Sequence, residues 1–391
     1  MKKTLIAFAA LSAIAGMAQA QSTVTLYGLL DANINGFKTN SFDATTGQAS
    51  SRSQTNVGSG GLNGSRFGFR ITEDLGGGLA AIGNLEGGLD IDTGKSAQGG
   101  LLFGRQANVG VASTTLGTVT IGRNKSPYYD LTSSTHLQQS VFDPSSYTNN
   151  TLSSIGLVNG VIPPAGAATA AQYLLANHGG QANVNSSTAL GFNARIDNSI
   201  RYTSPNFSGF SVSLLYGFGE NKTATTSASR TTGATAQYAN GPVLAYLGYQ
   251  SDALATAANG SKPALENTLV GGSYDFGVAK VGASYNRAKL KDITTSGAGI
   301  SPQKEYALSV AVPLGATTLQ AGYAQSKGDT LGKSTGFGVQ ALYALSKRTT
   351  LYTGYSTLKA YDKLASAYVL ATPGSSIERS KLLAAGVRHT F

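Results

Sequence analysis

The sequence predicts an all-β protein, a closed 16-stranded antiparallel transmembrane β-barrel. Three observations predict it. Apolar and polar residues alternate with a period of two, short turns and long polar connections take turns along the chain, and no apolar run of 18 or more residues follows the first 20. Because every backbone polar group must be satisfied within a bilayer, a chain without spanning helices can cross it only as a closed barrel.

The N-terminus has the three parts of a secretory signal peptide, expected over residues 1–20. Met1-Lys2-Lys3 is a positive start, Leu5 to Ala15 is apolar, and Ala18-Gln19-Ala20 is a small-x-small cleavage site. Cleavage would leave the barrel domain at 21–391 and lower the formal charge from +10 to +8, because two lysines are removed.

The composition excludes several classes of protein. Charged residues make up 12% of the chain, about half the share of typical soluble domains. The absence of Cys excludes disulfides and thiolate metal sites. With 50 Gly and 19 Tyr, the chain is unlike an ordinary cytosolic enzyme.

The alternation defines two faces in each expected strand. In the first strand, Leu26, Leu30 and Ile34 share one face, and Tyr27 and Asp31 share the other. The same pattern recurs over 208–218, 304–313 and 336–345. The apolar face carries Tyr and Phe near strand ends, as lipid-facing girdles do, and the small polar face suits a wet lumen.

The connections are of two kinds that alternate along the chain. Seven short turns are expected on the periplasmic side, at 74–78, 115–117, 204–207, 240–242, 275–277, 313–315 and 346–348. Eight long loops are expected on the external side, at 36–63, 91–100, 124–195, 219–232, 252–265, 291–303, 326–335 and 360–379. Fifteen connections join sixteen strands, and an up-and-down membrane barrel places its long loops at one end in this way.

An ordered set of motifs resembles the general (diffusion) porins of Gram-negative bacteria, of the β-proteobacterial type. The chain also ends on an aromatic residue, Phe391, as outer-membrane barrels do. The other motifs are Val24-Thr25-Leu26-Tyr27-Gly28, Gly64-Ser65-Arg66-Phe67-Gly68-Phe69-Arg70, Thr72-Glu73-Asp74-Leu75-Gly76-Gly77-Gly78-Leu79, Gly117-Thr118-Val119-Thr120-Ile121-Gly122-Arg123, Ser199 to Phe210, and Leu345-Ser346-Lys347-Arg348-Thr349.

The resemblance implies a homotrimer in the cell outer membrane, in contact with outer-membrane lipid and lipopolysaccharide. It implies a passive, water-filled channel for small hydrophilic solutes and ions, with Phe391 as an assembly signal. A third loop, at about 124–195, would fold inward and narrow the pore. Two features depart from the family: His389 stands where a hydrophobic residue is usual, and the third loop is long.

Six residues are candidates for the pore constriction. Arg66 and Arg70 alternate with Phe67 and Phe69, so both arginines are expected in the lumen, because an arginine facing lipid at mid-membrane costs about 2–4 kcal/mol. Their alternative role is to brace the wall through salt bridges. The full set is Arg66, Arg70, Arg105, Arg123, Asp130 and Asp143.

Strand parity alone places two of these candidates on the lipid side. Arg123 shares the parity of Ile121, although Gly122 permits a bulge and the resemblance places this arginine at the constriction. Arg105 shares the parity of Ala107 and is expected near the external mouth.

The acidic candidates come from the third loop. Asp130 and Asp143 would oppose the basic wall and set a transverse field in the narrowest part of the channel. Their alternative role is ordinary loop capping. A basic wall with opposing carboxylates predicts a weak anion preference.

Other functions find little support in the sequence. The three histidines, His136, His178 and His389, lack metal-ligand spacing, and no nucleotide-binding fingerprint or nucleophile elbow occurs, so no catalytic, metal or cofactor site is expected. Lys and Arg are scattered rather than clustered, which argues against nucleic-acid binding despite a pI of about 9.5. An adhesin with long loops and, less favoured, a barrel enzyme stay open as alternatives.

Overall fold

The computed structural model describes most of the barrel. The described residues are 22–43, 48–135, 137, 140–144, 192–225, 227–253, 260, 262, 264–292, 294–295, 298–299, 301–329, 332–359 and 375–391. The expected signal peptide, 1–20, and the larger part of the expected third loop lie outside them. Within these ranges, no helix has both the length and the apolar character needed to cross a membrane.

The described residues form strands with two short helical segments. The helical segments are α2 (Pro127–Thr135) and η1 (Ser140–Phe142). The strands are β1 (Thr23–Asp43), β2 (Gln48–Ser59), β3 (Arg66–Gly76), β4 (Leu79–Asp90), β5 (Lys95–Ser96), β6 (Gln106–Ser113), β7 (Gly117–Lys125), β8 (Arg195–Thr203), β9 (Phe210–Phe218), β10 (Arg230–Asn240), β11 (Val243–Ala253), β12 (Ala264–Asp275), β13 (Lys280–Lys291), β14 (Thr294–Thr295), β15 (Ala298–Gly299), β16 (Gln303–Leu314), β17 (Thr317–Gly328), β18 (Gly332–Ala344), β19 (Thr349–Lys359) and β20 (Ser375–Thr390).

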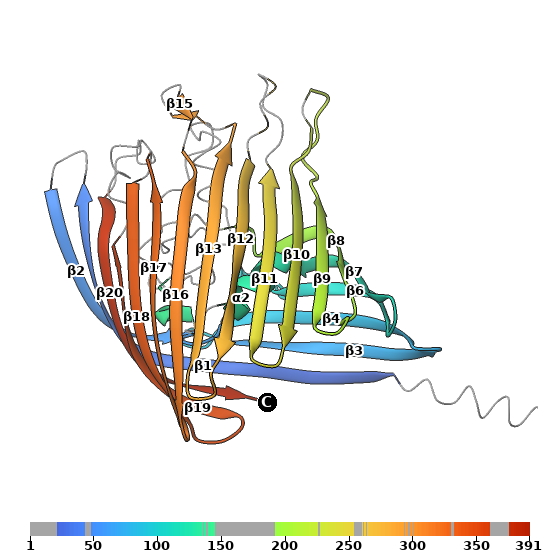
Figure 1. Cartoon of the computed structure of the whole chain (residues 1–391), viewed down its shortest axis with the longest axis horizontal. Helices are drawn as coiled ribbons and strands as arrows, with labels where there is room; N and C mark the ends of the chain where they lie inside the picture. Colours follow the sequence, from blue (N-terminus) through green and yellow to red (C-terminus); the bar gives the residue numbers. More distant parts are fainter. Residues whose placement is uncertain are drawn as a thin grey trace, which may run out of the picture.

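The strands close into one antiparallel barrel (Figure 1). Apart from β2 and β3, which do not pair with each other, each long strand pairs with its neighbours in the chain, and β20 pairs with β1 to complete the ring. β2 pairs with the second half of β1 and β3 with the first half, so the two share one position in the barrel. With β5, β14 and β15 set aside as two-residue pieces, sixteen strand positions remain, which confirms the predicted fold class.

Two expected external loops are largely strand. The 36–63 segment continues the β1–β2 hairpin to Asp43 and Gln48, and the 326–335 segment continues β17 and β18 to Gly328 and Gly332. These extensions carry polar residues on both faces, so they lack the apolar alternation that marks a strand in the sequence. Backbone pairing holds them, together with side-chain contacts such as the burial of Phe37 and the hydrogen bond from the Ser334 hydroxyl to the carbonyl of Lys359.

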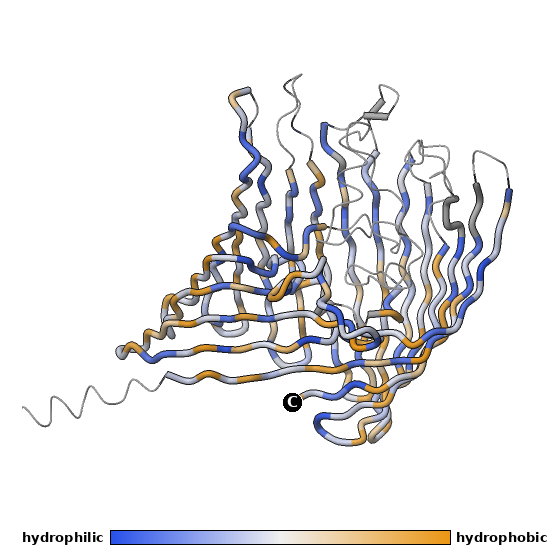
Figure 2. The backbone as a smooth tube through the Cα atoms, turned by 180° about the vertical axis from the view of Figure 1, so that it is seen from behind, coloured by the Kyte–Doolittle hydropathy of each residue, from blue (hydrophilic) through white to orange (hydrophobic). Residues whose placement is uncertain are grey.

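The predicted faces are confirmed along the strands. Ile34 is 65% exposed on the outer wall, whereas Asp31 is fully buried on the inner side. Figure 2 shows hydrophobic and hydrophilic residues alternating along the tube. The apolar residues of the outer wall therefore face lipid, and the polar residues face the lumen.

The last residue completes the seam of the barrel. Phe391 exchanges two backbone hydrogen bonds with Gly28, each 3.1 Å long, and so extends the β1–β20 ladder by one step. A Cβ on Gly28 would lie 2.2 Å from the Phe391 ring, so only glycine leaves room for it. The ring covers a glycine gap in the neighbouring strand, a known way of stabilising sheets. The role of Phe391 as an assembly signal stays a prediction.

Candidate functional site: the basic wall of the lumen

A carboxylate on β4 gathers two of the predicted arginines. Glu86 accepts a hydrogen bond of 2.7 Å from Nε of Arg105 and lies 3.6 Å from Nε of Arg66. Register places Glu86 opposite Gly68 of β3, whose missing side chain opens space for the aromatic ring of Tyr27. The alternation that predicts Arg66 in the lumen therefore also places Glu86 there.

Tyr27 joins Arg70 to the same group. The Arg70 guanidinium lies 4.4 Å from the centre of the Tyr27 ring, a cation–π contact, and the Tyr27 hydroxyl donates to Glu86 over 3.0 Å. Arg66, Arg70, Arg105, Tyr27 and Glu86 thus form one cluster, the basic wall. Within the described ranges no ion pair involves Arg70, so its charge is held by an aromatic face instead of a carboxylate.

Arg105 lies in the lumen cluster, not near the external mouth as expected. Strand parity from Ala107 does not apply to it, because β6 begins only at Gln106 and the preceding residues form a turn. The backbone N–H of Arg105 also donates to the carbonyl of Glu86, over 3.1 Å. The bend at this point turns the side chain inward, where it is 11% exposed.

Arg123 has different partners. It sits at a register shift between Gly122 and Asn124, and Gly122 has a φ of 127°, so the bulge permitted by the sequence is present. Its guanidinium binds Asp197 and the carbonyl of Gly104. Arg123 stands opposite Ala107 and makes no contact with Glu86, so the structure does not bring it into the basic wall.

The described start of the expected third loop lies on the inner side of the barrel. Helix α2 packs against β9 to β13 on the inner side, where Leu131 and Tyr128 fill the space above Gly248. The hydroxyl of Tyr128 donates to Asn286 of β13 over 2.9 Å, and the Tyr128 ring meets Phe192 edge-on at 4.8 Å. These contacts fix the start of the loop to the inner side of the barrel wall formed by β9 to β13.

Asp130 ties α2 back to the root of the loop. Its carboxylate lies 3.0 Å from Nζ of Lys125 and 2.6 Å from the guanidinium of Arg201 on β8. Burial raises the pKa of Asp130, but the charges of Lys125 and Arg201 and their hydrogen bonds outweigh it and hold the pKa below its usual value. Asp130 is thus paired with basic residues, rather than facing Arg66 and Arg70 across the opening.

Asp143 is also placed differently from the expectation. It is 3% exposed and lies between Phe142 and Pro144, which dock on the inner side of β18 and β19. Gly336 and Gly338 let this segment approach, since Cβ atoms there would lie 2.6 Å and 1.9 Å from its carbonyl oxygens. Being buried against the wall, Asp143 presents no open charge to Arg66 and Arg70.

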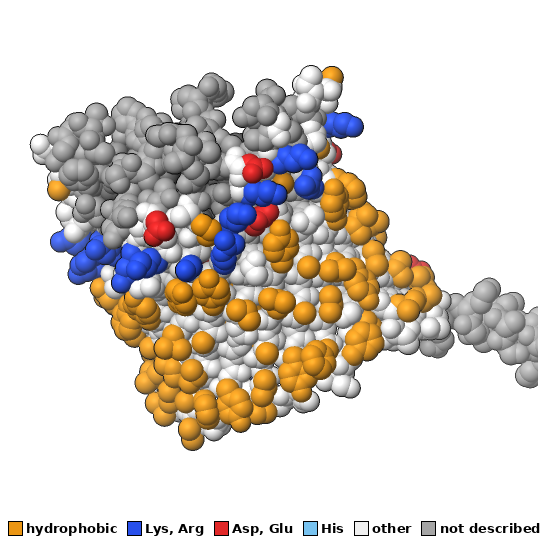
Figure 3. All heavy atoms as spheres, turned by 45° about the horizontal axis from the view of Figure 1, so that its top comes forward, with side chains coloured by type: hydrophobic (Ala, Val, Ile, Leu, Met, Phe, Trp, Pro, Cys, Tyr) orange, Lys and Arg blue, Asp and Glu red, His pale blue; other side chains and the backbone are white. Residues whose placement is uncertain are grey.

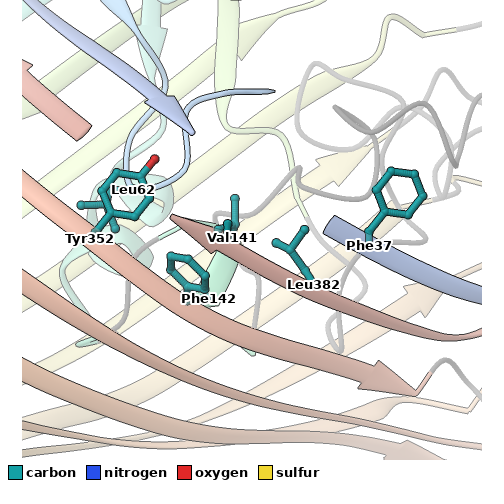
Figure 4. Close-up of a cluster of buried hydrophobic side chains, with 7 residues drawn as sticks. Phe37, Leu62, Val141, Phe142, Tyr352 and Leu382 are labelled. Carbon is teal, nitrogen blue, oxygen red and sulfur yellow. The ribbon is translucent and has the colours of Figure 1, made fainter. Parts of the chain in front are cut away.

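The segment around Phe142 also packs against the connection between β2 and β3, as Figure 4 shows. Phe142, Val141 and Leu62 pack with Tyr352 in a buried apolar cluster. The hydroxyl of Tyr352 donates to Asp31 over 2.5 Å. Asp31 also accepts from the backbone N–H groups of residues 61–63, at 3.1, 2.8 and 2.8 Å. The 60–64 connection between β2 and β3 is therefore latched to the lumen wall.

Comparisons with known proteins agree with this geometry. The Gram-negative porin family matches residues 7–363. The chain belongs to that family. It is 31% identical over 437 aligned residues to an outer membrane porin protein of Bordetella pertussis, and 33% identical over 404 to outer membrane porin protein 32 of Delftia acidovorans, each alignment spanning all of both chains.

Solved porin structures share its fold. The anion-selective porin from Comamonas acidovorans has a TM-score of 0.67 and 27% identity, covering 95% of this chain and 100% of that one. OmpT of Vibrio cholerae, in a trimer form, has a TM-score of 0.55 and 19% identity, covering 95% and 99%. The family places this porin in the outer membrane, with its short turns toward the periplasm.

Sequence reasoning missed three residues of the porin's lumen. Glu86 carries the central negative charge of the basic wall. Its position in the alternation of β4 is a signal from which its place on the lumen side could have been predicted. Arg195 lies 5.3 Å from the ring centre of Tyr129, beside the root of the loop, and Arg201 holds Asp130. The sequence offered no signal for Arg195, because it falls at the edge of the long third loop.

The Asp130 tether yields a prediction about pH. Because the pKa of Asp130 is lowered in the folded protein, its contribution is fully present above the ordinary value of about 3.9 and is lost as pH falls through the lower folded value. Single-channel traces of the wild type are expected to keep one stable open level from pH 7 to pH 4. Asp130→Asn is expected to flicker already at pH 7, with Asp74→Asn, at the exposed end of β3, as the control. Equal traces for Asp130→Asn and wild type would contradict the tether.

Proposed function

We propose that this porin forms a passive, water-filled channel for small hydrophilic solutes and ions, with a weak preference for anions. The observation that carries the proposal is the charge of the basic wall. Arg66, Arg70 and Arg105 supply three positive charges to the lumen side and Glu86 supplies one negative charge, a net +2. Charged rings that line a pore set its ion preference.

The preference is expected to be weak. Asp130 is neutralised by Lys125 and Arg201, and Asp143 is buried, so neither acid opposes the wall strongly. The preference stays weak for two other reasons. The negative charge of Glu86 cancels part of the positive charge of the basic wall, and salt screening limits the reach of the remaining charge to about 8 Å at physiological salt. The anion selectivity stated for the Comamonas porin supports the same sign for this chain.

We further propose a homotrimer set in outer-membrane lipid and lipopolysaccharide. The trimeric form of a structural relative supports the oligomer. We propose residues 1–20 as the cleaved signal and about 124–195 as the constriction loop of a barrel at 21–391. We propose no catalytic activity, since the family consists of channels.

The channel itself is tested by inserting the purified protein into a planar bilayer. Uniform single-channel current steps are expected, in multiples consistent with three pores per insertion. A protein that folds as strands but yields no steps would contradict the channel and favour the adhesin alternative, in which the loops and not the lumen carry the function.

A further inference from the structure

Arg70 differs from the other arginines of the basic wall in what its N–H groups contact. Arg66 and Arg105 both lie against the carboxylate of Glu86. Within the described ranges, the guanidinium of Arg70 makes no hydrogen bond and no ion pair, and the contact that holds it is the face of the Tyr27 ring, at 4.4 Å. The donors of Arg70 are therefore open to a solute in the lumen.

The Tyr27 ring holds this guanidinium in a fixed orientation. The ring lies against Gly68, where an added Cβ would be 2.8 Å from the Tyr27 hydroxyl oxygen, and the hydroxyl donates to Oδ1 of Asn84 over 3.1 Å. An aromatic face supports the flat side of a guanidinium and leaves its N–H edge free. Because a group that is already oriented loses less entropy on binding, Arg70 is prepared to bind a planar anion.

Polar side chains continue from Arg70 along one row of the lumen wall. Strand register places Thr25 of β1 and Asn84 of β4 directly beside Arg70, and Asn108 of β6 beside Asn84. All four face the lumen, since directly opposed residues of adjacent strands share a face. The outer wall has the opposite character: on the side shown in Figure 3, hydrophobic side chains cover the wall, and Lys and Arg gather in one band. The row on the lumen side thus offers a hydroxyl, a guanidinium and two amides.

The two amides keep hydrogen-bonding groups free for a ligand. Asn84 uses Oδ1 to accept from the Tyr27 hydroxyl, and Asn108 donates from Nδ2 to the carbonyl of Arg123 over 3.3 Å. In the part of the chain that the structure describes, Nδ2 of Asn84 and Oδ1 of Asn108 have no hydrogen-bond partner. A free donor beside a free acceptor matches a chain of hydroxyl groups, because a hydroxyl both donates and accepts.

We propose that the Arg70 row, made up of Thr25, Arg70, Asn84 and Asn108, is a binding site for hydroxylated carboxylates, the class to which sugar acids belong. The carboxylate binds the N–H edge of Arg70 through two parallel hydrogen bonds, and the hydroxyls bind Asn84 and Asn108. Arg70 and Asn108 are two strand spacings apart, about 10 Å, so the hydroxyls lie several bonds away from the carboxylate. Chloride cannot form the paired hydrogen bonds, so the site distinguishes carboxylates from halides beyond their common charge. The inference rests on the proposed function, since a solute reaches Arg70 only through an open lumen.

The test measures how potassium gluconate blocks the chloride current through single channels of the purified porin, at constant ionic strength. Gluconate is compared with hexanoate, a carboxylate of the same chain length without the hydroxyls. Arg70→Lys keeps the positive charge and removes the planar guanidinium, and Asn84→Ala removes one amide. The matched controls are Arg348→Lys, on the exposed turn between β18 and β19, and Gln237→Ala, on the lumen side of β10.

Gluconate is expected to reduce the wild-type current saturably, and at lower concentration than hexanoate does. The half-blocking concentration of gluconate should rise about fivefold or more in Arg70→Lys, because lysine keeps the charge but loses the two parallel hydrogen bonds. It should rise about twofold or more in Asn84→Ala, whose block by hexanoate should match that of wild type, and both controls should behave as wild type. An unchanged gluconate block in Arg70→Lys, or equal block of wild type by gluconate and hexanoate, would overturn the site and leave the anion preference standing. A protein without current steps would overturn the channel, and the site with it.

Discussion

Replacing Arg66 and Arg70 together with glutamine is expected to remove most of the anion preference of the channel. The two arginines sit on one face of β3, and the change lowers the net charge of the basic wall from +2 to 0. Glu86 keeps its closer partner Arg105, at 2.7 Å, so the variant leaves no carboxylate unpaired. The chloride-to-potassium permeability ratio should fall about twofold or more at low salt and less at high salt, because screening shortens the reach of the charges.

The matched control keeps the charge and changes the geometry. Arg66→Lys with Arg70→Lys retains both positive groups, so it should keep the sign of the preference. Reversal potentials under a potassium chloride gradient measure both variants. If the glutamine variant is as anion-preferring as wild type, these arginines brace the wall and do not set its selectivity.

Replacing Asp31 with alanine is expected to cause the largest loss of stability. The carboxylate is fully buried and accepts three backbone N–H groups from residues 61–63 and the hydroxyl of Tyr352. Buried donors left without a partner cost about 1–3 kcal/mol each, so the free energy of unfolding should fall by about 3 kcal/mol or more. The thermal unfolding midpoint in detergent, followed by circular dichroism, measures the loss.

Two further variants separate the carboxylate from its neighbours. Asp31→Asn keeps one acceptor oxygen and should lose less stability than Asp31→Ala. Tyr352→Phe keeps the ring that packs on Phe142, at 6.2 Å between ring centres, and should lose least. An alanine variant as stable as wild type would mean that the 60–64 connection is held by the apolar cluster around Leu62 alone.

The fold was predictable from the sequence because a membrane barrel repeats one simple pattern. Phe67 and Phe69 alternate with Arg66 and Arg70, and that alternation alone places the arginines inside. The pattern ends where the strands leave the membrane. Lys327 of β17 and Lys333 of β18 lie opposite each other in strand, yet without apolar neighbours their segment has the composition of a loop.

The site was less predictable because several of its residues break the pattern. Arg105 precedes its strand and Arg123 stands at a bulge, so counting by twos gives no reliable direction for either. The positions of Asp130 and Asp143 in the third loop depend on contacts with residues far away in the sequence. Asp130 pairs with Arg201, which is 71 residues away in the sequence, and no local spacing predicts such a pair.

The most direct test of the central claim is the reversal potential of the wild-type porin in a planar bilayer under a potassium chloride gradient. The basic wall predicts a modest potential of the sign set by chloride, which shrinks as the salt concentration rises. A potential of the sign set by potassium would contradict the account, since it would mean that carboxylates rather than Arg66, Arg70 and Arg105 govern passage through the lumen.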